Sequence, residues 1–189
     1  SPILNGEKET GVTIIRVEKD VDAGNILLQE KTSIFDNETA GQLWERLTIL
    51  GSKMLIKVIK QIEKGKLKEK KQDNDEETFT KKFEKEDAKL DFCETDEQIL
   101  NKIRAFNPTP IAYFEYQNEK IKIYEAEKVS SSEKTACGTI ISSSAKEGLL
   151  IKCKNGIVSI KRLQAPNGKI LNIKDFINGR KFNINYIIK

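Results

Sequence analysis

Asp22 is the residue of this sequence whose type and setting could support acid–base chemistry. It lies in Val21-Asp22-Ala23-Gly24, between a stretch of near-alternating apolar residues and the apolar residues Ile26-Leu27-Leu28. The first stretch predicts a strand, and the small residues after it allow a tight turn and the close approach of a ligand. A carboxylate at the end of a strand can move protons when its surroundings shift its pKa. It can also hydrogen-bond the backbone of its own turn, and spacing alone favours this second interpretation.

The composition describes a charge-rich chain of 189 residues, 33% charged and 38% hydrophobic, which is long enough for one large domain or two small ones. Its apolar runs are only a few residues long, and its first residues do not resemble a signal peptide, so we expect no association with a membrane. The three cysteines, Cys93, Cys137 and Cys153, are widely spaced, and there is no histidine. These are too few ligands for a zinc site, so we expect no metal, and reduced thiols in a cytoplasmic protein.

The net charge of +4 is distributed unevenly along the chain. From Lys120 onward there are 14 Lys and Arg against 5 Asp and Glu, a net charge of +9, whereas residues 1–119 hold 19 and 24, a net charge of −5. A basic C-terminal third favours a polyanionic partner, most simply nucleic acid. A solvated lysine-rich surface explains the same charge equally well.

Two helices are predicted from their N-terminal caps. Thr39 and Thr95 are each followed three residues later by a glutamine, which is the spacing of a capping box. In the first helix, apolar residues recur at three- and four-residue intervals over residues 43–62. We expect this apolar face to be covered by a sheet or another helix, with Trp44 and Met54 in the core.

The sequence after residue 111 predicts short strands. They are expected at 112–116, 121–126, 138–142, 149–154 and 157–162, with a brief helix at 174–178. Residues 117–120 predict a hairpin-like turn, and Asn155-Gly156 predicts a two-residue turn of type I′, in which both residues have positive φ. Five short strands indicate a small OB-like β-barrel, whose basic face would be a platform for RNA.

Residues 66–88 differ in composition from their neighbours. Charges of both signs crowd together and the apolar periodicity ends, so we interpret the segment as an interdomain linker. Phe79 and Phe83 would anchor it to a neighbouring surface. Three lysines lie near these aromatic residues and could contact phosphate or form a solvated face: Lys81, Lys82 and Lys85.

Several blocks, in order, resemble the second half of the methionyl-tRNA formyltransferases. The blocks are Ser1-Pro2-Ile3 with residues 5–14, Asp20-Val21-Asp22-Ala23-Gly24-Asn25-Ile26-Leu27, the helix from Thr39 to Gly65-Lys66-Leu67 followed by Gln72-Asp73, and Ile103-Arg104-Ala105-Phe106-Asn107-Pro108. The resemblance covers essentially the whole chain. It implies an α/β fragment of a nucleotide-fold formyltransferase catalytic domain (residues 1–65), a charged linker (66–90) and an OB-like barrel that binds tRNA (91–189).

The resemblance implies formyl transfer from 10-formyltetrahydrofolate to the amino group of methionine on initiator tRNA, for translation initiation. The family surrounds its tetrahedral intermediate with an asparagine, a histidine and an aspartate, of which only the aspartate has a counterpart here, Asp22. It would hold a water and the histidine in position while the amine loses its proton. The backbone of five residues would line the pterin pocket: Val17, Glu18, Lys19, Asp20 and Val21. We expect this chain by itself to be inactive.

For tRNA, the resemblance points to the linker. Where the family often has Tyr-x-Pro-Lys, this chain has Phe79-Thr80-Lys81-Lys82, so Lys82 corresponds to the lysine near the tRNA end. The other expected tRNA-binding residues are Lys81, Lys85 and Arg104. The family's Asn-Pro-Trp-Pro-Gly is replaced by residues 107–111, Asn-Pro-Thr-Pro-Ile, which removes an aromatic residue and a turn glycine. We expect the protein to be a monomer.

Two alternatives remain open at this point. A folate-dependent formyltransferase that acts on an amino-sugar nucleotide would share both domains, although a small acceptor needs no extended positive surface. A non-enzymatic RNA-binding module would use the barrel alone, but such a protein would have no need of Asp22 in its matching block.

Overall fold

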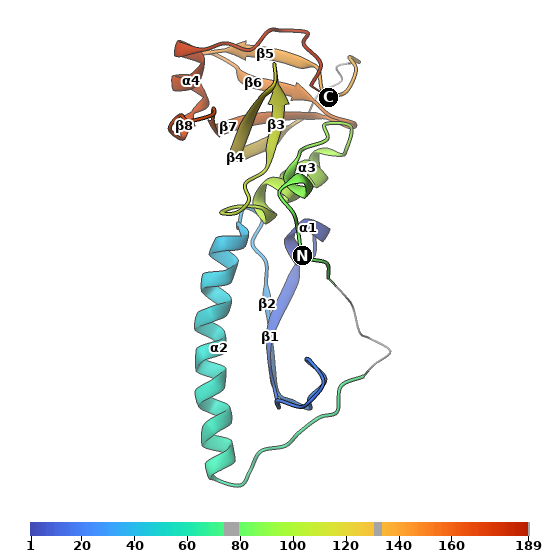
Figure 1. The fold of residues 1–189 in the computed structure, drawn as a ribbon, viewed down its shortest axis with the longest axis vertical. Coiled ribbons are helices and arrows are strands. Elements are labelled where there is room, and N and C mark those ends of the chain that lie inside the picture. The colour runs from blue at the N-terminus through green and yellow to red at the C-terminus, as the bar shows by residue number, and fades with distance from the viewer. Residues whose placement is uncertain (74–79, 131–133, 189) are drawn as a thin grey trace. The chain divides into compact units, whose positions relative to one another are not determined.

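The chain folds into two compact units in a computed structural model that describes residues 1–73, 80–130 and 134–188. The N-terminal unit comprises Pro2 and Glu7–Lys82, and the C-terminal unit comprises Ser1, Ile3–Gly6 and Phe83–Lys189. Figure 1 labels the helices and strands of both units. Within the described ranges, no helix combines the length and the hydropathy that a membrane span requires.

The N-terminal unit is built on an antiparallel hairpin and one long helix. Strands β1 (Glu9–Ile15) and β2 (Ile26–Ser33) pair from Glu9 opposite Ser33 to Ile15 opposite Ile26, with an irregularity after Ile14. The helix α2 (Ala40–Glu63) lies beside the hairpin, and residues 16–25 join the two strands at one end (Figure 1). The predicted order of strand, loop, strand and helix is confirmed.

The start of α2 is fixed by a capping box and by an ion pair. Thr39 N–H donates to the Gln42 side chain at 2.9 Å, and Gln42 N–H donates to Thr39 Oγ1 at 3.4 Å, as predicted. The carboxylate of Glu38 is buried and accepts from Arg46 Nε at 2.8 Å and Nη2 at 2.9 Å, while Arg46 Nη1 donates to Thr32 Oγ1 at 2.7 Å. These contacts join the first turns of α2 to the end of β2.

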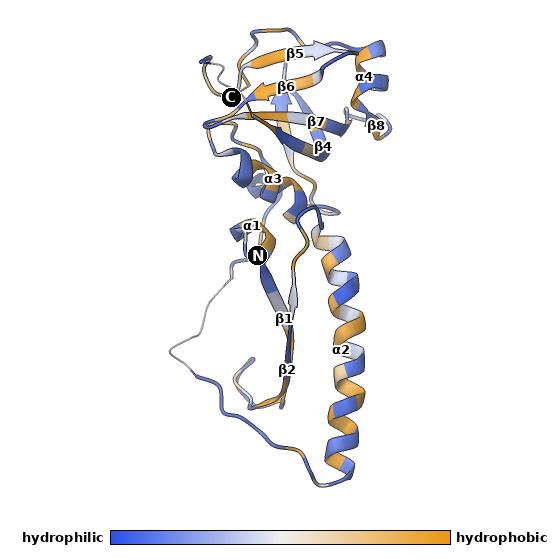
Figure 2. Ribbon diagram, turned by 180° about the vertical axis from the view of Figure 1, so that it is seen from behind, coloured by the Kyte–Doolittle hydropathy of each residue, from blue (hydrophilic) through white to orange (hydrophobic). Residues whose placement is uncertain are grey.

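The helix α2 carries two sets of apolar residues, which differ in burial. Orange stretches alternate with blue ones along this helix in Figure 2. Leu43, Met54 and Val58 are buried, and this confirms the expectation for Met54. The second set is exposed over 47–73% of each residue: Trp44, Ile49, Leu55, Ile56, Ile59 and Ile62. The expectation that Trp44 lies in the core is therefore wrong for the described chain, because its position on the helix turns it away from the buried stripe.

The C-terminal unit is a curled antiparallel sheet with helices packed on it. Its elements are α1 (Pro2–Asn5), the 3-10 helix η2 (Glu86–Ala88), α3 (Asp96–Ala105), β3 (Tyr113–Tyr116), β4 (Glu119–Val129), β5 (Ile140–Ser144), β6 (Gly148–Lys152), β7 (Ile157–Gln164), β8 (Leu171–Asn172) and α4 (Ile173–Gly179). The strand order is β3-β4-β7-β6-β5, with β8 also paired to β7. The five expected strands and the short helix are present, and β8 was not expected.

The described strands do not form a closed barrel, because β3 and β5 stand at opposite ends of the pairing order. The sheet is antiparallel and curled, and the expected OB-like barrel is not confirmed. Its core is formed by apolar side chains from the strands and from α3 and α4, and each such side chain stabilises the fold by about 1.5–3 kcal/mol through its burial. The core residues with no measurable exposure include Ile99, Phe114, Ile121, Ile123, Ile140, Leu149, Ile151, Val158, Ile160 and Leu163.

The tight turn of type I′ occurs at a different hairpin from the one predicted. Gln117 and Asn118, between β3 and β4, have φ of 51° and 66°. Asn155 and Gly156 connect β6 to β7 without positive φ, so the type I′ prediction for them is wrong. The reason is a contact with α3: Asn155 Oδ1 accepts from the backbone N–H of Asp96 at 2.9 Å, and Asn155 Nδ2 donates to Asp96 Oδ1 at 3.0 Å. This contact shapes the loop.

The expectation of three reduced thiols is also wrong. Cys93 and Cys137 form a disulfide, with 5.2 Å between their Cα atoms, and only Cys153 is a free thiol. The residues next to Cys93 and Cys137 in the sequence both hydrogen-bond the segment 152–154, which brings the two cysteines together across 44 positions. Cys153 is buried, and burial raises the pKa of its thiol.

Candidate functional site

Residues 16–25 form the loop that carries Asp22, called here the Asp22 loop. Arg16 N–H donates to the carbonyl of Asn25 at 2.9 Å and closes its base. Asp22 has a φ of 56°, in the left-handed region that aspartate adopts more readily than most residues. Gly24 is buried, and a Cβ placed on it would lie 1.7 Å from the carbonyl oxygen of Arg16. The loop conformation therefore requires glycine at this position.

A second segment, residues 69–72, holds the Asp22 loop from outside and is called here the clamp segment. Lys70 and Ile26 exchange two backbone hydrogen bonds, of 2.7 and 2.9 Å, so this segment adds one antiparallel bridge to the start of β2. The Gln72 side-chain amide donates to the carbonyls of Asp22 at 2.6 Å and Gly24 at 2.7 Å. The clamp segment thus contacts both the base and the tip of the loop.

Glu69 joins the two ends of the Asp22 loop through its carboxylate. Arg16 Nε donates to both of its oxygens, at 3.1 and 3.2 Å, and Arg16 Nη2 donates to Oε1. Asn25 Nδ2 donates to Oε2 at 3.1 Å. The hydrogen bonds from Arg16, and then from Asn25, lower the pKa of Glu69, and the hydrogen bond with Glu69 raises the pKa of Arg16.

The side chain of Asp22 is exposed. Within the residues that the structure describes, its carboxylate makes no hydrogen bond or ion pair, whereas its backbone carbonyl accepts from Gln72. The interpretation that this aspartate bonds its own turn is therefore wrong. Among the described residues this carboxylate has no hydrogen-bonding partner, and it lies on a loop whose backbone is held by hydrogen bonds. Such a group can accept a proton or hold a water.

The five residues expected to line a folate pocket lie on the same loop as Asp22. Val17, Glu18, Lys19, Asp20 and Val21 are all exposed, and the two valines are exposed by 93% and 90%. Among the described residues, no three His, Cys, Asp or Glu side chains gather in a way that could hold a metal ion.

The residues expected to contact tRNA are divided between the units. Lys81 and Lys82 are exposed and are the last residues of the N-terminal unit. Lys85 is exposed and precedes η2, while Arg104 is half-buried in the last turn of α3, where Nη2 donates to Asn101 Oδ1 at 2.6 Å. Phe79, which begins the matching block, lies outside the described residues.

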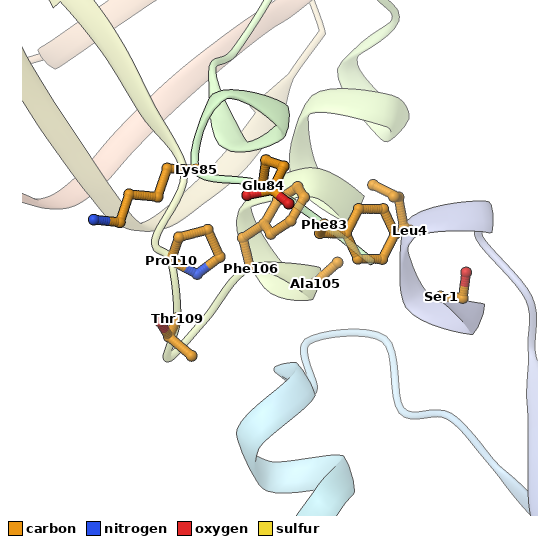
Figure 3. A pocket seen from close by; sticks show the side chains of 9 residues that line it. All are labelled: Ser1, Leu4, Phe83, Glu84, Lys85, Ala105, Phe106, Thr109 and Pro110. Atoms are coloured by element: carbon orange, nitrogen blue, oxygen red, sulfur yellow. The ribbon is translucent and has the colours of Figure 1, made fainter. Parts of the chain in front are cut away.

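The C-terminal unit has a pocket of about 440 Å³ next to the start of η2 (Figure 3). The rings of Phe83 and Phe106 meet edge to face in it, 5.4 Å apart, so the expected anchoring by Phe83 is confirmed. The residues around the pocket are Ser1, Leu4, Phe83, Glu84, Lys85, Ala105, Phe106, Thr109 and Pro110. Of the expected tRNA-binding residues, Lys85 is the one that lines it.

The clamp segment was not expected from the sequence. In the sequence, Gln72 belongs to a matching block without any indicated role, and Glu69 falls in the segment predicted to be a linker. The contacts join residues 44 to 53 positions apart, and no local periodicity indicates such contacts.

Comparisons with known proteins identify two family domains along the chain. A family model described as "Formyl transferase" matches residues 2–59, and one described as "Formyl transferase, C-terminal domain" matches residues 82–181. The methionyl-tRNA formyltransferase of Clostridium beijerinckii is 39% identical over 187 residues, 99% of this chain and 60% of that protein. That of Fusobacterium nucleatum is 37% identical over 185 residues, 96% of this chain and 59% of that protein. The chain thus spans about three fifths of these relatives.

Among solved structures, the chain is similar to the N-formyltransferase of Helicobacter canadensis in complex with folinic acid and dTDP-3-aminofucose. The TM-score is 0.66 at 25% identity, over 85% of this chain and 58% of that one. Formyltransferases with different acceptors therefore resemble this chain.

Replacing Gly24 by alanine tests the close approach at the base of the Asp22 loop. The new methyl group must displace the Arg16 carbonyl, so we expect Gly24→Ala to lower the free energy of unfolding by about 1–3 kcal/mol, as overpacking does. Urea unfolding measures this change. The control Gly51→Ala places a Cβ 3.4 Å from Val12 Cγ1 and favours helix by up to about 1 kcal/mol. Equal effects of the two changes would contradict the constraint.

Replacing Glu69 by glutamine tests the ion pair through its dependence on pH. Because the pKa of Glu69 is lowered by folding, its contribution to stability is complete above the ordinary carboxyl pKa of 4.5 and is lost as pH falls through the lowered value. Near neutral pH we therefore expect Glu69→Gln to unfold at a lower urea concentration than the wild type. This difference should shrink in acid. The control is Glu45→Gln, at an exposed position of α2, and an acid dependence shared by both variants would exclude the ion pair as its cause.

Proposed function

This chain belongs to the formyl transferase family, and on that premise we propose that the full-length protein transfers a formyl group from 10-formyltetrahydrofolate to the amino group of methionine on initiator tRNA. The observation that carries the proposal is the exposed carboxylate of Asp22 on a hydrogen-bonded loop, in a chain that is 37–39% identical to methionyl-tRNA formyltransferases. In this proposal Asp22 is the catalytic residue that the chain supplies.

The chemistry requires a group of this kind. Attack of an amine on a formyl carbon forms an oxyanion and an ammonium, and the ammonium must lose a proton before the carbon–nitrogen bond to the donor breaks. A carboxylate can accept that proton or hold the water that carries it. The family's asparagine and histidine have no counterparts in this sequence, which contains no histidine. Asp22 would complete a set whose other members come from elsewhere in the full-length protein.

The formyl donor would lie along the loop before Asp22. Five consecutive exposed residues, Val17 to Val21, offer backbone N–H and C=O groups, and the side chains of Val17 and Val21 are almost fully exposed. Polar backbone edges between apolar side chains suit a flat heterocycle with donors and acceptors on its rim, such as a pterin. When bound, the folate supplies the activated formyl group. This geometry fits the folate expected from the sequence.

The acceptor is proposed to be tRNA, bound through Lys81, Lys82, Lys85 and Arg104 and through the domain of residues 91–189 that contains the curled sheet. Two methionyl-tRNA formyltransferases, 39% and 37% identical to this chain, support this acceptor, while the enzyme solved with an aminofucose nucleotide is 25% identical. Because that enzyme was solved with a sugar nucleotide, an amino-sugar nucleotide is the second candidate for the acceptor. Membership of a transferase family argues against a module that only binds RNA.

The activity test uses the full-length protein with 10-formyltetrahydrofolate and three acceptors: initiator methionyl-tRNA, elongator methionyl-tRNA and dTDP-3-aminofucose. We expect formylation of the initiator tRNA, and a loss of kcat of at least about 100-fold in Asp22→Asn, the size typical of a lost acid–base group. Asp36→Asn, at a residue 90% exposed at its side chain, is the control and should retain activity. Formylation of the sugar nucleotide alone would reject tRNA as the acceptor.

A salt series tests the linker contact. Removing one phosphate contact lowers the slope of log affinity against log salt by about one, so we expect Lys82→Ala in the full-length protein to weaken binding of initiator tRNA and reduce the slope by that amount. Lys53→Ala, at an exposed position of α2, is the matched control. If Lys82→Ala leaves both the affinity and the slope at their wild-type values, Lys82 does not contact tRNA.

A further inference from the structure

Gln72 holds the backbone on both sides of Ala23. Its Nε2 lies 2.6 Å from the carbonyl oxygen of Asp22 and 2.7 Å from that of Gly24. We propose that Gln72 is a positioning residue for formyl transfer, because it fixes the backbone from which the Asp22 carboxylate projects. This inference rests on the proposed function of Asp22 and adds to it a residue that acts without touching the substrate.

Glutamine is suited to this position by its donors and its length. A primary amide has two N–H groups, so one nitrogen can donate to two carbonyl oxygens at once. Both acceptors are carbonyl oxygens, so the nitrogen of the Gln72 amide, not its oxygen, must face them. The hydrogen-bond pattern therefore assigns the orientation of this amide. Glutamate at this position would have no donor when ionised, and asparagine is shorter by one methylene. A single side chain thereby connects two carbonyls of a tight turn.

The anchor of Gln72 is itself fixed to the same loop. Two residues earlier, Lys70 pairs with Ile26 through two backbone hydrogen bonds, and Glu69 binds the side chains of Arg16 and Asn25. The amide of Gln72 therefore extends from a segment whose register against β2 is set independently of Asp22. A residue in the left-handed region, as Asp22 is, persists where surrounding contacts over-determine it.

The Gln72 hydrogen bonds also affect the position of the Asp22 carboxylate. Since the Asp22 carboxylate makes no hydrogen bond or ion pair in the described residues, its position depends mainly on the backbone that carries it. Loss of the Gln72 hydrogen bonds would free the turn, and the carboxylate would spend less time where the reacting amine meets it. Misplacement of a reacting group by about 1 Å can cost about 100-fold in rate.

The test is the near-isosteric change Gln72→Glu in the full-length protein, with Gln72→Met as a second variant that also lacks donors. The control is Gln29→Glu, which removes the amide donor of a 3.0 Å hydrogen bond to Thr13, within the hairpin and outside the loop. We expect both Gln72 variants to lower kcat for initiator methionyl-tRNA by at least about 10-fold, with the KM for tRNA unchanged. The control should retain the wild-type kcat.

A double-mutant cycle separates positioning from a general loss of structure. If Gln72 acts only through Asp22, Gln72→Glu should have no further effect on kcat in an Asp22→Asn background. Amide hydrogen exchange at Arg16 and Ile26, whose N–H groups make the hydrogen bonds at the base of the loop, should be faster in Gln72→Glu than in Gln29→Glu. An unchanged kcat in an active enzyme, an equal loss in the Asp22→Asn background, or unchanged exchange would each overturn the inference. Inactivity of the wild type with every acceptor would instead overturn the proposed function, and the inference that rests on it.

Discussion

The contact between residues 69–72 and the Asp22 loop is the constraint on which the N-terminal unit depends. For this contact to form, the chain must pass through β2 and α2 and then return to the end of the hairpin where β2 begins. β2 has eight residues and extends about 27 Å, and α2 has 24 residues and extends about 36 Å in the opposite direction. The helix thus brings the clamp segment back to the end of the hairpin that carries Asp22 (Figure 1).

One ion pair lies near the start of α2, and a second lies after its end. Glu38 and Arg46 join the end of β2 to the first turns of α2, and Glu69 and Arg16 join the chain after α2 to the base of the loop. The first is half-buried at Arg46 and nearly buried at Glu38, with side-chain exposures of 31% and 5%, so water screens it less than it screens a surface pair. The second is more exposed, with side-chain exposures of 49% at Arg16 and 29% at Glu69, and it joins the clamp segment to the base of the Asp22 loop.

The features that the sequence predicted correctly depend on neighbouring residues. A capping box needs a threonine and a glutamine three positions apart, and both predicted boxes are present, at Thr39 and Thr95. The features that it missed depend on distant residues. Asn155-Gly156 is a favourable type I′ pair, but the contact of Asn155 with α3 decides the loop. Periodicity predicts the apolar positions of α2, but it does not tell which of them are covered by the rest of the protein. For Asp22, only the resemblance to a family indicates a functional role, since spacing alone favours a structural one.

The fold also changes the meaning of the charge pattern. The stretch from Lys120 onward, with its net charge of +9, belongs to the same compact unit as residues 83–119. Residues 83–189 together hold 18 Lys and Arg against 14 Asp and Glu, a net charge of +4. Ion pairs cross the boundary between the two stretches, as Arg180 with Glu119 and Lys128 with Glu97 do. The net positive charge that a polyanion would meet on this unit is therefore moderate. In the proposed binding of tRNA, individually placed cations such as the linker lysines would matter more than the overall charge of the C-terminal third.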